Sequence, residues 1–415
     1  MLRPLLVCTT LLVWTSNASA QKLRDQLEGL LTFGPWTVPL RVGTLSTDRR
    51  AIVPNDAFLA SAVQPNAALA SFLVNWMTAD ASSTPLASTG GGRAFRFVGG
   101  VPVEDRPAPG PIFGERATTL GRGAVLAGVG YTGVQFSKVR GVPMSGLDLK
   151  FTQGSAAPAT ADVLDVQESL DYQMTVTTLF ATAGVLDRLD VGVVVPVVQA
   201  RLRGASTARV LAGTAGAPST VLGGTADAPV LTSQQSVAGR ASGIGDVALR
   251  AKVNLVDRPT AGFAFLGDVR LPTGDAANLL GSGALAVRVL GVYSGRYGPV
   301  VPYVNAGYLH IARATINDAF LATVGIDADM ARWVTVSLGV LGQRHAGASA
   351  YRLPTGTSAR PLTNIPEIRD DALSGSLGAK LGVGGVRATL NVLAPYTRGG
   401  PRPDLAYTFG LERAF

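Results

Sequence analysis

From about residue 91 onward, apolar and polar side chains alternate with a period of two. In residues 245–256, Leu249 and Val253 share one face, and Arg250 and Lys252 share the other. Because successive side chains of a strand point to opposite faces, this pattern predicts strands with one apolar and one polar face. The same alternation recurs in residues 124–136, 173–182, 261–272, 284–294, 334–343, 373–381 and 386–396.

The links between these stretches are short and long in turn. Alternating tight and large connections are typical of outer-membrane barrels, which have short periplasmic turns and longer external loops. Such a barrel begins and ends on the periplasmic side, which requires an even number of strands. We therefore predict an all-β, antiparallel, up-and-down transmembrane barrel of about 14 strands, within a range of 12–16. The expected strands are 92–101, 124–136, 145–153, 166–183, 189–203, 244–256, 261–272, 283–294, 300–312, 318–329, 333–344, 371–382, 386–396 and 404–415; the long links are 204–242, 273–282 and 345–370.

Composition supports a surface that faces lipid. Of the 415 residues, 47% are apolar and only 15% are charged, whereas soluble proteins have about 25% charged residues. After residue 20 no stretch of about 18 apolar residues occurs, which argues against a helical membrane protein. Lipid cannot satisfy open backbone groups, so a membrane-spanning chain of this kind must close into a barrel.

The polar faces of the central strands predict the lining of the barrel. Turning a charged side chain toward lipid at mid-depth would cost about 2–4 kcal/mol, so these residues are expected to face the lumen. Both charge signs occur on neighbouring strands, which favours ion-paired ladders. Such residues either form a polar wall that guides a solute or only stabilise the barrel. The predicted lumen-lining residues are Asp246, Arg250, Lys252, Asn254, Asp268, Arg270 and Arg288.

The N-terminal part of the chain has a different pattern. Residues 1–20 are expected to be a secretory signal peptide, with Arg3, an apolar core and a small-residue cleavage site ending at Ala20; an N-terminal anchor helix is the alternative. Residues 21–90 are expected to form a partly helical hatch or a periplasmic segment, with the barrel occupying 91–415. Helical spacing occurs in 22–31 and in 55–77, where Pro65 is expected to interrupt the helix.

The last strand carries a candidate signal for barrel assembly. Thr408, Gly410 and the terminal Phe415 fit a pattern of polar residue, glycine and spaced hydrophobic residues that ends on an aromatic. Arg413 departs from the pattern, at a depth where a cation near the interface is tolerated. The expected partners are therefore the barrel-assembly machinery, outer-membrane lipid and a small hydrophobic solute.

Candidate catalytic and metal chemistry is sparse. Cys8 is the single cysteine and lies in the expected signal peptide, while His310 and His345 are not in a metal-ligand spacing. The sequence has no nucleophile elbow and no phosphate-binding loop with its lysine. The net charge is +8, but the basic residues are scattered without interleaved aromatics, which argues against nucleic-acid binding. We expect no enzyme activity, cofactor or metal.

Four segments resemble a known group of proteins. Residues 110–123 (GPIFGERATTLGRG), with 86–92 (LASTGGG) upstream, are similar to a segment of bacterial outer-membrane transporters. Residues 243–252 (GIGDVALRAK) and 271–275 (LPTGD) resemble the group named after the phenol meta-degradation pathway, which is similar to the long-chain fatty-acid transporter (FadL-like) family. The resemblance covers residues 83–415 in patches.

This resemblance implies a barrel of about fourteen strands with an N-terminal hatch, carrying hydrophobic compounds across the cell outer membrane of a Gram-negative bacterium. The fatty-acid transporters have an Asn-Pro-Ala signature in the hatch. Residues 64–67 read Gln-Pro-Asn-Ala here, so no ligand-binding residue is carried over.

The sequence thus favours a porin-like channel for passive uptake of small hydrophobic or aromatic compounds. A structural or surface-interaction barrel without transport activity is the alternative. A barrel enzyme and a secreted soluble β protein are more distant ones.

Overall fold

The computed structural model describes residues 21–59, 63–72, 94–98, 101–105, 114–154, 161–213, 216, 218–313, 316–349, 352–354, 362–383 and 385–415. The expected signal peptide, the motif at 86–92 and the first part of the motif at 110–123 lie outside these residues. In the described part, no helix is long and apolar enough to cross a membrane.

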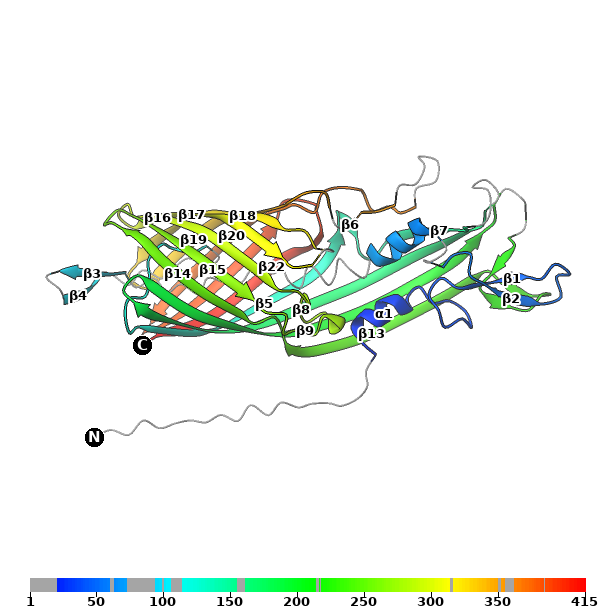
Figure 1. Cartoon of the computed structure of the whole chain (residues 1–415), viewed down its shortest axis with the longest axis horizontal. Helices are drawn as coiled ribbons and strands as arrows, with labels where there is room; N and C mark the ends of the chain where they lie inside the picture. Colours follow the sequence, from blue (N-terminus) through cyan, green and yellow to red (C-terminus); the bar gives the residue numbers. More distant parts are fainter. Residues whose placement is uncertain are drawn as a thin grey trace, which may run out of the picture.

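Twelve antiparallel strands form a closed barrel (Figure 1). The ring closes because the last strand pairs with the first along twelve residue pairs, and the backbone N–H groups of Val125 and Phe415 each donate to the other's carbonyl oxygen, at 3.1 and 2.7 Å. The chain therefore enters and leaves the ring at the same end. In order, the strands are β5 (Val125–Val139), β8 (Val163–Leu186), β9 (Leu189–Leu211), β14 (Ala248–Asp257), β15 (Ala261–Arg270), β16 (Ala286–Gly295), β17 (Val300–Ile311), β18 (Ala319–Ala331), β19 (Val334–His345), β20 (Ala372–Val383), β21 (Val386–Pro395) and β22 (Pro401–Ala414).

The ring has two strands fewer than the fourteen listed from the sequence, but twelve lies within the expected range of 12–16 and is an even number. The stretch expected as strand 92–101 belongs to a separate hairpin of β3 (Ala94–Val98) and β4 (Val101–Asp105). The stretch expected at 145–153 is β7 (Leu147–Thr152), which pairs with β8 beyond the ring. Period-two alternation predicts that a strand forms, but not which strand it pairs with, so both were wrongly counted as barrel strands.

Two strands of the ring continue far beyond it. β8 and β9 have 24 and 23 residues, whereas β14 and β15 have 10 each. At about 3.3 Å per residue, the two long strands reach roughly 75–80 Å. β13 (Thr232–Ile244) pairs with β9 along this outer part, although residues 204–242 were expected to form a loop. We call the sheet of β7, outer β8, outer β9 and β13 the extension; it projects from the end with the long links (Figure 1).

The described N-terminal residues pack on one face of the extension. α1 (Leu23–Gly29) lies against β13, with Leu23 and Leu27 buried. Residues 64–72 form a second helix, whose Leu69 and Phe72 join the same apolar core. Pro65 does not interrupt this helix as expected, because it lies in the first turn, where proline is tolerated. The division at residue 90 into a hatch or periplasmic segment and a barrel stays a prediction.

Short elements complete the outer end. A 3₁₀ turn, η1, lies beside α1. The bounds are β1 (Val42–Leu45), β2 (Ile52–Asn55), β6 (Val142–Pro143), β10 (Thr220–Val221), β11 (Gly223–Gly224), β12 (Pro229–Val230) and η1 (Ala276–Asn278).

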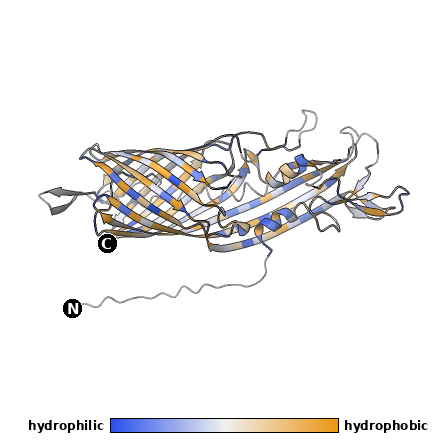
Figure 2. Ribbon diagram, viewed as in Figure 1, coloured by the Kyte–Doolittle hydropathy of each residue, from blue (hydrophilic) through white to orange (hydrophobic). Residues whose placement is uncertain are grey.

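The apolar face of β9 changes sides along its length. In the ring, Val191 and Val193 point outward with 45% and 37% exposure, and Asp190 is buried inside. In the extension, Leu202 is buried on the inner face, and Arg203 is exposed on the outer one. Figure 2 shows how apolar and polar residues alternate along these strands. The exposed side chains give the ring an apolar exterior, as an outer-membrane barrel requires, and give the extension a polar one.

Candidate functional site

Residues 114–120 lie inside the barrel and are held by its wall. Glu115 is 5% exposed. The side-chain amide of Asn305 forms hydrogen bonds with both the backbone N–H and the backbone carbonyl of Glu115. The Glu115 N–H donates to Asn305 Oδ1 at 2.7 Å, and Asn305 Nδ2 donates to the Glu115 carbonyl at 2.9 Å. Gly114 packs directly on the ring of Tyr303, where a Cβ atom would lie 2.0 Å from a ring carbon. We call residues 114–120 the interior segment.

Further contacts tie the interior segment to other strands. Arg116 donates from Nη2 to Asp327 on β18 at 2.6 Å, and both side chains are almost fully buried. Asn254 Nδ2 on β14 donates to the Ala117 carbonyl at 2.7 Å. The Leu120 N–H donates to the carboxylate of Asp190 on β9 at 3.0 Å. The segment is thus bonded to opposite parts of the ring.

Charged residues of three neighbouring strands form a continuous ion-paired ladder. Arg250 lies between Glu115 and Asp268, at 3.0 and 2.6 Å. Arg288 Nε donates to the second oxygen of Asp268 at 2.6 Å. Lys252 Nζ lies 3.7 Å from Glu115. Removing one member of a buried pair typically costs about 3–5 kcal/mol, because the other charge remains buried, so the ladder holds the interior segment firmly.

The predicted lumen residues fall into three groups. Arg250, Lys252, Asn254 and Asp268 are buried on the inner face of β14 and β15, against the interior segment or its partners. Arg270 and Arg288 line a cavity further out. Asp246 is buried, but it fixes the loop after β15 by accepting from the N–H groups of Gly274 and Ser282. Their functional role stays a prediction.

Sequence reasoning missed Glu115 and Arg116. Both lie in the motif at 110–123, where a charged pair directly precedes the first ring strand. The motif has no period of two, so alternation gave no orientation for its side chains. The partner residues are 135 and 211 positions away along the chain.

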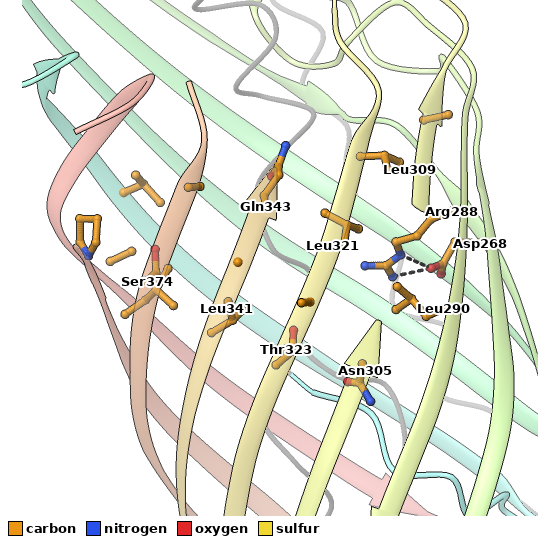
Figure 3. Close-up of a pocket in the computed structure, with 18 of the residues that line it drawn as sticks. Asp268, Arg288, Leu290, Asn305, Leu309, Leu321, Thr323, Leu341, Gln343 and Ser374 are labelled. Carbon is orange, nitrogen blue, oxygen red and sulfur yellow. Dashed lines mark hydrogen bonds and ion pairs between the residues drawn. The ribbon is translucent and has the colours of Figure 1, made fainter. Parts of the chain in front are cut away.

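A cavity of about 220 Å³ occupies the outer half of the lumen. Its wall combines leucines with a few polar groups, and Asn305 lies at its inner end (Figure 3). Glu115, which is bonded to Asn305, also lines the cavity. The Asp268–Arg288 pair is on one side and Gln343 and Ser374 are on the other. The cavity is therefore amphipathic, with most of its charged residues on β14–β16 and the others at Glu115 and Arg402. Its leucines are Leu290, Leu309, Leu321, Leu341 and Leu393.

The expected assembly signal lies on the last strand, β22. Thr408 points inward and shares a hydrogen bond with Thr132 at 3.1 Å, and Gly410 pairs with Gly130 of β5. Phe415 points outward with 67% exposure, and the Arg413 guanidinium lies 5.2 Å from its ring centroid. Arg413, the residue that departs from the pattern, thus lies near the end of β22, beside Phe415.

The two histidines lie near the outer rim. His310 Nδ1 is 2.9 Å from Asp318, and the His345 N–H donates to Asp371 at 2.8 Å. Among the residues described, no three His, Cys, Asp or Glu side chains are grouped to hold a metal ion.

No protein-family model matches the chain, and no curated protein is significantly similar in sequence. Several solved structures are similar to this chain at low sequence identity. An outer membrane channel from Pseudomonas putida F1 is 13% identical, over 72% of this chain and 98% of that chain, with a TM-score of 0.44. The Ralstonia pickettii toluene transporter TbuX is 10% identical over 80% and 100%, with a TM-score of 0.35. A Pseudomonas aeruginosa FadL homologue is 13% identical over 72% and 91%, with a TM-score of 0.31.

Proposed function

We propose that this chain is an outer-membrane channel for passive uptake of small hydrophobic or aromatic compounds. The observation that carries the proposal is the leucine-lined cavity of about 220 Å³ in the outer half of the lumen. For comparison, an apolar cavity of about 150 Å³ accommodates benzene. A solute of roughly one ring would bury its apolar surface against the leucines, with Gln343 and Ser374 available to polar substituents.

In this proposal the interior segment is the gate. It closes the inner end of the cavity through the bonds of Glu115 to Asn305 and of Arg116 to Asp327. Passage requires the segment to shift while its polar groups exchange wall partners for water. The mechanism is diffusion and uses no cofactor.

Dye uptake by intact cells tests this function. Cells that express the chain are mixed with the apolar dye N-phenylnaphthylamine, which an intact outer membrane largely excludes, and its fluorescence increase is followed. Leu341→Trp fills the cavity from β19 and should reduce uptake to the level of cells without the protein. Val340→Trp is the matched control, because Val340 is the next residue of the same strand and points outward with 44% exposure.

A gate variant adds a change in the opposite direction. Arg116→Ala together with Asp327→Asn removes both charges of the pair, and uptake should rise several-fold above wild type. Equal uptake by cells with and without the wild-type chain would contradict the channel.

A structural or surface-interaction barrel is the second candidate. The extension favours it, because roughly half the lengths of β8 and β9 lie outside the ring. Under this function, neither Leu341→Trp nor the gate variant changes dye uptake.

A further inference from the structure

Three arginines gather on the outer face of the extension, directly above the apolar belt. Arg201 and Arg203 belong to β9 and point outward, away from the core that holds Leu202. Arg240 of β13 lies directly opposite Arg201 in the sheet register, so the two share a face. Arg203 and Arg240 are exposed, and Arg201 is half-buried. We call these three residues the arginine cluster.

The arginine cluster has no ion pair with any described residue, unlike the arginines of the lumen ladder. Like charges directly opposite in an antiparallel pair are destabilising, with Cβ atoms about 5 Å apart. Asp171 lies opposite Arg203 on β8, and the side-chain amides of Gln135 and Gln173 donate to it. Because this one carboxylate stands against three guanidinium groups, the cluster keeps a net positive charge.

The depth of the cluster indicates what it contacts. Val197 pairs with Ile244, which is 56% exposed and forms the top of the outward apolar belt on these strands. Arg201 follows four residues later, or about 13 Å along the strand. For a strand tilted by about 40°, that is roughly 10 Å above the belt, within reach of lipid headgroups for a long side chain.

We propose that the arginine cluster binds the phosphorylated headgroup of a lipid of the outer leaflet. Guanidinium groups match phosphate geometry with two parallel hydrogen bonds, and a phosphate between Arg201 and Arg240 would remove their mutual repulsion. Because the belt continues below the cluster on the same strands, the acyl chains of that lipid would lie against Val197 and Ile244. This inference is independent of whether the lumen conducts.

Binding of diphosphoryl lipid A to the full-length protein in dodecyl maltoside tests the proposal. The triple variant R201Q/R203Q/R240Q should bind about tenfold more weakly, as expected for three partly exposed charge contacts. The matched control is R188Q/R258Q/R332Q, which removes three exposed arginines from the short turns and should bind like wild type. Asp171→Asn should bind more tightly, by a few fold, because it removes the competing negative charge.

Several outcomes would overturn the proposal. They are wild-type protein that does not bind, a triple variant that binds like wild type, and a control triple that loses as much affinity. If phosphatidylethanolamine bound as tightly as lipid A, the cluster would not recognise an anionic headgroup. If inorganic phosphate alone competed with lipid A, the cluster would be a site for free anions and not for a lipid. Folding of each variant is checked by its heat-dependent gel mobility; Asp171→Asn keeps the test decisive if the triple variant does not fold.

Discussion

The two halves of β8 differ in which of their faces is apolar. In the ring, Leu179 and Val185 point outward, with 43% and 52% exposure, and Thr182 points inward. In the extension, Leu170 is buried on the inner face and Ser169 is exposed on the outer face. The backbone and its pairing to β9 continue through the change, so the surroundings set the pattern. Lipid surrounds the ring and water surrounds the extension, and each face takes the residues that suit its contact.

The largest expected effect comes from a titratable residue on the otherwise apolar inner face of the extension. Glu168 lies on the apolar inner face of β8, 2% exposed, and its Oε2 has no hydrogen-bond partner among the described residues. Burial raises the pKa of Glu168 to about 8. Below about pH 4.5 the carboxyl is neutral in both the folded and unfolded states. As the pH rises toward 8, only the unfolded state loses its proton, so the extension loses up to roughly 4–5 kcal/mol of stability.

Trypsin cleavage within residues 21–59, followed from pH 5 to pH 9 against a protease-rate standard, measures this loss. Wild type should become steadily easier to cleave up to about pH 8, and Glu168→Gln should remove this dependence. Glu28→Gln is the control, because the Glu28 side chain is 51% exposed. The same pH dependence in wild type and Glu168→Gln would contradict the assignment.

The second prediction tests where the membrane boundary lies between the ring and the extension. The same substitution, to arginine, is made at two outward positions of β8. Leu179→Arg places a cation against lipid within the apolar belt and should cost up to about 2–4 kcal/mol of unfolding free energy. Ser169→Arg, ten residues away on the same outer face, should change it by about 0.5 kcal/mol or less, because the site is in water. Urea unfolding in lipid vesicles, followed by tryptophan fluorescence, measures both. Equal costs would mean that the membrane boundary is wrongly placed.

The same comparison explains what the sequence could predict. Alternation predicted the twelve strands of the ring, with two further strands that lie outside it, and it predicted an inward direction for Arg250 and Lys252, because lipid on one side imposes a strict period of two. β13 (TSQQSVAGRASGI) was not predicted as a strand, because neither of its faces is strongly apolar. One face is exposed to water, and the other is only partly covered by α1. The contacts of the interior segment were not predicted, because its partner residues are distant in sequence, as for Arg116 and Asp327. Local patterns do not encode such pairings.

The smallest expected effect concerns Asp162, a carboxyl at the start of β8 that is as buried as Glu168. Burial acts to raise the pKa of Asp162, but hydrogen bonds from Thr220 and Ser219 outweigh it and hold this pKa below its ordinary value. A lowered pKa stabilises the fold above about pH 4, and this stabilisation is lost as the pH falls, opposite in sign to Glu168. Asp162→Asn should cost about 1–3 kcal/mol at neutral pH, because one accepting oxygen becomes a donor facing other donors.

Urea-dependent cleavage of the extension, by trypsin at pH 7 and by an acid protease at about pH 2.5, measures this change, with the exposed Asp227→Asn as the control. The cost of Asp162→Asn should shrink at about pH 2.5, well below the ordinary carboxyl pKa, where wild type has lost part of the same interaction. A cost that is equal at both pH values would mean that the carboxylate charge does not hold residues 219–220. It would also remove the contrast with Glu168, whose pKa burial raises, whereas hydrogen-bond donors lower the pKa of Asp162.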